Sequence, residues 1–229
     1  MRASLFRLGI MLGAAAFAWL LADSLFALPM PAVDLRPLIS ANLAQSGVAH
    51  PVTAVLLNFR GFDTLLEIAV MLVALIAVLA SLPTALLVES ARATARANTD
   101  PMLPAFSRMA APLMLLGALY LLWAGAFRPG GAFQAGALLA AALALLHLAQ
   151  LIPAWSAPGP LLRGGLVSGF VVFLVIALAL LTEGTLLQYP PAIAGLLILA
   201  IESALTVSLA LILAGLFLFI SSDGGCGNE

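Results

Sequence analysis

The sequence predicts an all-α protein, a polytopic bundle of about six transmembrane helices. Hydrophobic residues make up 64% of the 229 residues and charged residues only 8%, with a mean hydropathy of +1.18. A soluble domain needs roughly a quarter of its residues charged, so this composition excludes a folded globule in water. The apolar residues also fall into separate runs, most of them long enough to cross a bilayer core of about 30 Å.

Proline, glycine and polar residues separate these runs. Helices are expected over residues 5–28, 65–88, 109–127, 133–152, 166–181 and 192–220. Pro29-Met30-Pro31 should end the first, because proline removes a backbone donor and clashes with a helical predecessor. Arg128-Pro129-Gly130-Gly131 predicts a tight turn between the third and the fourth, in which Pro129, Gly130 and Gly131 have a structural role. Gly165 and Gly169, four residues apart, predict close packing of the fifth helix on a neighbour.

The same proline, glycine and polar residues divide the chain into six predicted segments. They are an N-terminal transmembrane helix (1–30), an extramembrane or interfacial segment (31–60), a transmembrane helix (61–90), a polar loop (91–108), a four-helix membrane domain (109–220) and a polar tail (221–229).

The first segment has two interpretations. Arg2 and Arg7 before the run Leu8–Leu21 fit a signal peptide as well as a membrane helix. A retained helix is favoured, since the small-x-small pattern needed for cleavage is poor around Phe26-Ala27-Leu28.

Composition and motifs exclude several classes of function. Nine arginines, no lysine and ten acids give a net charge of −1, which argues against a nucleic-acid partner. Cys226 is the only cysteine, so one chain can form neither a disulfide nor a cysteine-ligated cluster. No Walker loop, HExxH motif or nucleophile elbow occurs. We therefore expect no enzymatic activity, no catalytic residues, no metal site and no cofactor.

Ionisable residues inside the apolar runs are the candidates for ion translocation. Glu202 lies about a third of the way along the last run, where an acid costs about 3 kcal/mol unless it is protonated, paired or hydrated. The alternative is a neutral Glu202 that only joins neighbouring helices by a hydrogen bond. His147, in the fourth run, suits a proton relay, although a single histidine among Ala and Leu is more often a packing residue.

Asp63 and Glu67 are the second group of candidates. They are four residues apart at the start of the second run, so both carboxylates lie on one helix face. Two such acids repel each other, which favours shared proton exchange or cation binding. A structural explanation competes for Asp63, since the helix dipole favours an acid in the first turn and Arg60 is near enough to neutralise it. Glu67, one turn deeper, is therefore the stronger candidate.

Two stretches resemble a known family. The run Asn58–Glu67, NFRGFDTLLE, resembles the DFRGFDTLGE pattern near the C-terminal end of the large subunit of Mrp-type multisubunit sodium/proton antiporters. Related membrane-bound hydrogenases carry this pattern in a small subunit. Leu103–Phe133 resembles the MnhB-like subunit of the same antiporters, whose members read GHNxPGGGF at the turn. Here Ala126-Phe127 replaces the family's His-Asn and Ala132 its third glycine, while the Pro-Gly-Gly bend is kept.

The resemblance covers about residues 51–220 and implies a tail of the large subunit joined to an MnhB-like subunit. It implies an accessory membrane subunit of a cation (sodium)/proton antiporter, in a bacterial inner membrane, with other antiporter membrane subunits, the lipid bilayer, protons and monovalent cations as partners. Glu67 aligns with the family's acidic residue. Two alternatives stay open. One is a membrane-arm subunit of a related hydrogenase, respiratory or ion-coupled uptake complex, and the other is a structural scaffold.

The arginines predict the orientation, because cytoplasmic loops are enriched in basic residues. With the N-terminus inside, six arginines (Arg2, Arg7, Arg92, Arg96, Arg108 and Arg163) are cytoplasmic and three (Arg36, Arg60 and Arg128) external. A reporter fused after Ala97 should therefore read as cytoplasmic, and one fused near Gln45 as external. The reverse pattern would contradict both the orientation and the first helix.

Overall fold

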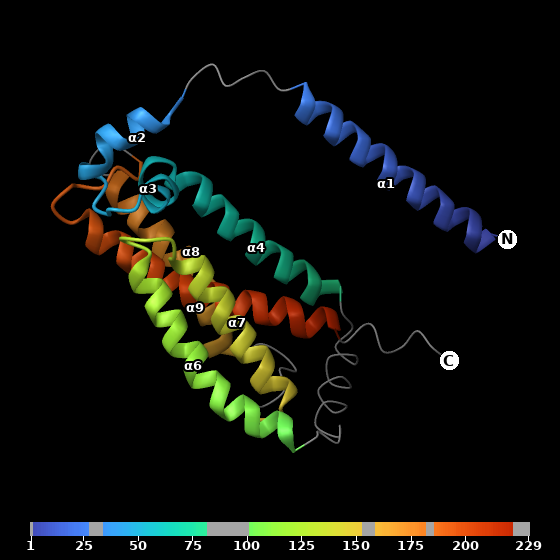
Figure 1. Ribbon diagram of the computed structural model, residues 1–229. Coiled ribbons are helices and arrows are strands. Elements are labelled where there is room, and N and C mark those ends of the chain that lie inside the picture. Colours follow the sequence, from blue (N-terminus) through green and yellow to red (C-terminus); the bar gives the residue numbers. More distant parts are fainter. Residues whose placement is uncertain (1, 28–33, 82–100, 153–158, 182–185, 222–229) are drawn as a thin grey trace. The chain divides into compact units, whose positions relative to one another are not determined.

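The computed structural model describes residues 2–27, 34–81, 101–152, 159–181 and 186–221. The chain divides into two units, residues 1–38 and 39–229, and each is described by itself. The described residues form helices and no strand, which confirms the all-α prediction (Figure 1).

The first unit contains the long helix α1 (Arg2–Phe26). Its described side chains are mostly exposed within the unit, among them Phe17 and Trp19. The expected proline break at residues 29–31 lies outside the described residues. Further along, Arg36 forms an ion pair with Asp34, at 2.9 Å between Nε and Oδ1. Hydrogen bonds from Arg36 lower the pKa of the Asp34 carboxyl.

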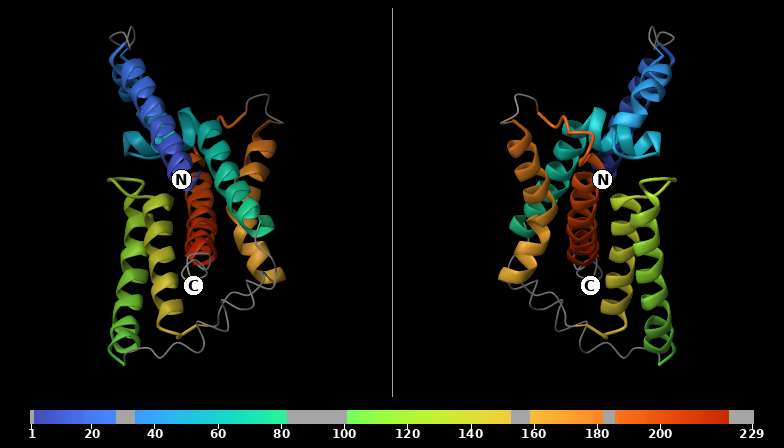
Figure 2. Two further views of the ribbon diagram at one scale, coloured as in Figure 1. Left: turned by 90° about the vertical axis from the view of Figure 1, so that its right-hand side faces the viewer. Right: turned by 90° about the vertical axis from the view of Figure 1, so that its left-hand side faces the viewer.

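The second unit is a helical bundle built around one central helix. Its long helices are α4 (Gly61–Ser81), α6 (Met102–Ala124), α7 (Ala132–Leu148), α8 (Pro160–Leu181) and α9 (Ala194–Ser221). Figure 2 shows α9 between the pair α6–α7 and the pair α4–α8, and α9 contacts all four. Helices α4, α6, α8 and α9 are long and apolar enough to span a bilayer, while α7 is shorter. The chain is thus a multi-pass membrane protein.

Among the helix starts, the largest differences from the hydropathy prediction are those of α6 and α8, which lie seven and six residues earlier than predicted. Helix α6 starts at Met102 rather than Met109, and the hydroxyl of Ser107 in its second turn donates to the carbonyl of Leu103 at 2.7 Å. Arg108 is exposed there. Helix α8 starts at Pro160, a residue suited to a first helical position because it needs no hydrogen-bond acceptor. Residues 91–100 of the predicted polar loop (91–108) lie outside the described residues, and residues 102–108 belong to α6.

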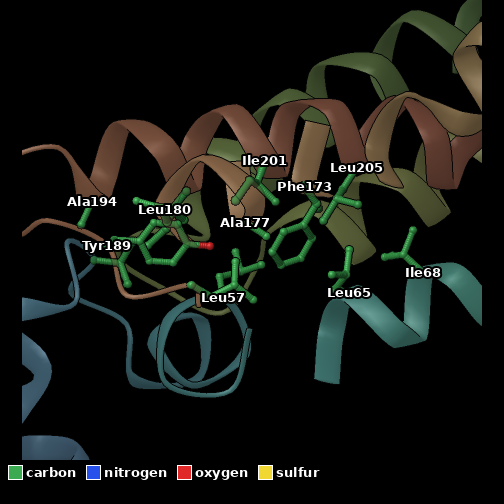
Figure 3. Close-up of a cluster of buried hydrophobic side chains, with 14 of the residues drawn as sticks. Leu57, Leu65, Ile68, Phe173, Ala177, Leu180, Tyr189, Ala194, Ile201 and Leu205 are labelled. Atoms are coloured by element: carbon green, nitrogen blue, oxygen red, sulfur yellow. The ribbon is translucent and has the colours of Figure 1, made fainter. Parts of the chain in front are cut away.

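The core lies between α4, α8 and α9 (Figure 3). Phe173 of α8 is fully buried, among Leu65 of α4 and Ile201 and Leu205 of α9. Tyr189, in the connection before α9, is buried at the edge of this core, and its hydroxyl has no hydrogen-bond partner among the described residues. Burial raises the pKa of this phenol, so Tyr189 stays neutral.

Helices α8 and α9 approach closely at the glycines that the sequence singles out. A Cβ atom on Gly169 would lie 2.8 Å from Cβ of Ser208 and 3.1 Å from Cα of Leu205. The Ser208 hydroxyl donates to the carbonyl of Leu166 at 2.5 Å, which adds a polar contact between the same helices. Small residues allow this approach, which supplies much of the packing energy in a bilayer.

Four short helical stretches lie before α4. They are α2 (Arg36–Asn42), η1 (Leu43–Gln45), α3 (Pro51–Ala54) and the π-type turn η2 (Val55–Phe59). Gly47 anchors this segment to the start of α9. Its φ of 80° suits glycine, and a Cβ there would lie 2.5 Å from the nitrogen of Gly195. Asn58 adds an internal hydrogen bond to the carbonyl of Ser46 at 3.0 Å.

We expect Gly169→Ala to destabilise the protein by about 1–3 kcal/mol, because the added methyl overpacks the α8–α9 contact. Gly164→Ala is the matched control on the same helix, since a Cβ there meets nothing within 4 Å. Thermal unfolding in detergent should show a lower midpoint for the first variant and an equal or higher midpoint for the second, since alanine is the better helix former. Equal midpoints would contradict this account of the contact.

Candidate functional site

Glu202 is buried against the turn that joins α6 to α7. It lies eight residues into α9 and is only 3% exposed. The backbone amide of Ala132, the first residue of α7, donates a hydrogen bond to its carboxyl group. The first amides of a helix have no partner within the helix, and the dipole makes this end positive. An acid that is costly at membrane depth therefore caps the start of a neighbouring helix.

The glycines of the turn make room for this carboxyl group. Gly131 has φ 106° and ψ −171°, a conformation open to glycine only. A Cβ on Gly131 would lie 2.7 Å from Oε1 of Glu202, and one on Gly125 would lie 3.3 Å from the same oxygen. The Gly131 amide donates to the carbonyl of Leu121 at 2.8 Å and closes the turn. A Cβ on Gly130 would lie 2.6 Å from the same carbonyl oxygen, whereas Pro129 is exposed.

The segment before α4 holds the turn from the other side. The amides of Ala49 and His50 both donate to the carbonyl of Ala126, at 2.8 and 3.0 Å. The buried hydroxyl of Thr53 donates to the carbonyl of Gly125 at 2.6 Å. The two contacts to Ala126 involve only its backbone, so they do not depend on the side chain at this position.

Two cavities meet at Glu202. The smaller, of about 410 Å³, is lined by three titratable side chains, His50, Glu67 and Glu202, and by Gly130 and Gly131. The larger, of about 850 Å³, lies between residues 40–49, the end of α6 and α9. Its lining is mostly apolar, and Glu202 is its only acid among the described residues. Glu202 therefore contacts both spaces.

The other two predicted acids, Asp63 and Glu67, lie in different surroundings. Asp63 forms an ion pair with Arg60 at the start of α4, and both side chains are more than half exposed. This pairing agrees with the structural explanation of Asp63. Glu67 lies one turn further along the same face and lines the smaller cavity. Glu67 and Glu202 therefore share a cavity, although they come from helices far apart in the sequence.

His147 lies away from this site. It is buried in the last turn of α7, and its Nδ1 has no hydrogen-bond partner among the described residues. Fifteen residues of helix separate it from Ala132, roughly 22 Å at 1.5 Å per residue. The structure thus does not bring His147 to Glu202.

The smaller cavity is also lined by four polar residues that the sequence predictions did not include, His50, Thr53, Thr64 and Gln134. One signal was present, a histidine immediately before the helix-starting Pro51. Among the described residues, no group of three His, Cys, Asp or Glu side chains could hold a metal ion. Two carboxyl groups and an imidazole can exchange protons, and this is the chemistry that the site offers.

Comparison with known proteins gives a family and two related folds. Residues 102–222 match the family model described as a domain related to the MnhB subunit of Na+/H+ antiporter. The fold is similar to a chain in the structure of the Mrp complex from Dietzia sp. DQ12-45-1b, with a TM-score of 0.66 and 21% identity over 96% of this chain. This chain spans 27% of that longer one.

The fold is also similar to a chain in the structure of the membrane-bound sulfane sulfur reductase, an archaeal respiratory membrane complex. The TM-score is 0.62 and the identity 20%, and the match covers 93% of this chain and 98% of that one. Both matches cover more than nine-tenths of this chain, so they include most of the residues before 102 as well. No protein of curated function matches the chain.

Thr53→Val should destabilise the α6–α7 turn by about 1–3 kcal/mol, because valine keeps the shape but leaves the buried carbonyl of Gly125 without its donor. Thr53→Ser restores a hydroxyl group and should recover most of the loss. Thermal unfolding in detergent measures both changes. If the two variants lost the same stability, the methyl group rather than the hydrogen bond would hold the turn.

Proposed function

The chain belongs to the family of domains related to the MnhB subunit of Na+/H+ antiporters, and from this membership and the site geometry we propose that it is an accessory membrane subunit of a multisubunit cation/proton antiporter. In this role it contributes to the ion route and to assembly, and it performs no bond-breaking chemistry. Its partners are the other membrane subunits, and its substrates are protons and monovalent cations. Its location is the bacterial inner membrane.

The observation that carries the ion-route part is Glu202 at the meeting point of two cavities. Acids inside membrane helices are expensive, and they mark ion or proton pathways when they face protein or a cavity that can hold water. A carboxyl group used only to join helices would need no open space beside it. Glu67 in the same cavity gives the route a second carboxyl group, near the start of α4.

A second candidate function is a membrane-arm subunit of a respiratory complex. The similarity to a chain of the sulfane sulfur reductase complex favours it, since nearly all of that chain is matched. The two candidates differ in partners. Purification of the native complex in mild detergent should recover large antiporter-like membrane subunits in either case, and redox subunits only in the second. Recovery as a free monomer would contradict both.

Glu67→Gln in the assembled complex should lower cation-driven proton movement in vesicles, because glutamine keeps the shape and hydrogen bonding of Glu67 but cannot ionise. A positioned acid–base group is worth about 10²-fold or more, which sets the expected loss. Asp63→Asn is the matched control, one turn away and paired with Arg60. It should change transport several-fold at most.

Two outcomes would count against this assignment of Glu67. Full transport by the Glu67→Gln complex would favour the scaffold function. Loss of the complex in that variant would make Glu67 a packing residue. A wild-type complex without cation-driven proton movement would overturn the proposed antiporter function itself.

A further inference from the structure

We propose that Glu202 binds the proton and not the metal cation of the exchange, and that it passes this proton between the two cavities with His50 as its partner in the smaller one. This inference rests on the proposed antiporter function. It assigns the ion that Glu202 carries and adds His50, a residue outside the sequence predictions, to the route.

The surroundings of Glu202 are unsuited to a metal cation. Hard cations take several oxygen ligands, whereas the backbone group that points at this carboxyl is the amide donor of Ala132. The amide belongs to the start of α7, whose positive end repels a cation and stabilises a carboxylate. The site can therefore hold the anion after a proton leaves, and it offers little to a cation that would replace the proton.

The position of the carboxyl group suits a relay. Oε1 fits into the space left by Gly125 and Gly131, so the group is held at one depth while it lines both cavities. Each cavity is large enough to hold water. A proton arriving from one cavity converts the carboxylate to the acid, and its departure into the other restores the carboxylate. The step moves one proton and no electrons.

His50 is placed to exchange protons with the smaller cavity. Its Nδ1 lies 3.5 Å from Oγ1 of Thr53, and the single hydroxyl proton of Thr53 is already donated to the carbonyl of Gly125 at 2.6 Å. At this contact Nδ1 is then the donor, which leaves Nε2 as the basic nitrogen of the ring. His50 comes from the start of α3, and Glu67 of α4 is the other titratable group lining the cavity.

The test separates the two ions by a spectroscopic readout. Infrared difference spectra of the purified complex should contain the band of the protonated Glu202 carboxyl, identified by its loss in Glu202→Gln and its displacement in Glu202→Asp. We expect the intensity of this band to change with pH. At constant pH the band should stay the same when the sodium concentration changes. A band that sodium removes or shifts would mean that Glu202 binds the cation, and would overturn the proposal.

Transport in vesicles is the second readout. Glu202→Gln should lower coupled proton and cation movement by about 10²-fold with the complex intact, and His50→Gln should lower it less, since water can bypass an imidazole. Ser203→Ala is the control, because Ser203 is the exposed neighbour on α9 and its hydroxyl donates to the carbonyl of Leu199 in its own helix. Full transport in Glu202→Gln would overturn the proposal. If the wild-type complex fails to transport, the antiporter function fails, while the infrared band still decides which ion Glu202 binds.

Discussion

The hydrogen bond between the Ala132 amide and the Glu202 carboxyl is the constraint on which the rest of the second unit depends. Glu202 lies eight residues after the start of α9 and needs a hydrogen-bond donor at its own depth. The Ala132 amide is available as this donor because α7 begins at the same depth. That start requires the Pro-Gly-Gly turn, whose inner surface must lack side chains to admit the carboxyl group. The same turn also exposes backbone carbonyl groups, and the segment around Thr53 donates hydrogen bonds to them.

Close packing of small residues keeps this arrangement in register. A Cβ on Gly136 of α7 would lie 2.8 Å from Cβ of Leu209, so α7 and α9 approach each other one turn below the capped end. Gly169 does the same between α8 and α9. Van der Waals contact is a main source of helix association in lipid, where there is no water to expel. The central α9 can therefore present Glu202 to the turn on one face, and it carries no other ionisable side chain.

Hydropathy predicts the helices well, because lipid demands apolar residues over a fixed length. It misplaces the starts of α6 and α8, where Arg108 and Arg163 are exposed on helical turns that hydropathy assigns to polar linkers. It also flags Glu202 by depth alone. Its hydrogen-bond donor could not be predicted, since apolar residues surround every membrane helix and periodicity does not show which face meets which neighbour. The meeting of Glu202 with a turn that ends 70 residues earlier, at Ala132, and with His50 beyond it, is a property of the packed bundle.

The shortness of α7 has an electrical consequence. Its 17 residues span roughly 25 Å, less than the bilayer core of about 30 Å. Beside it lie the two cavities lined by Glu202, and water in them would thin the insulating layer at the capped end. The membrane potential would then fall over a shorter distance, and the field along α7 would be stronger than across undisturbed lipid. A charge that crosses the whole field gains about 2.3 kcal/mol per 100 mV. With water in the cavities, a change of charge at Glu202 would therefore be coupled to the membrane potential.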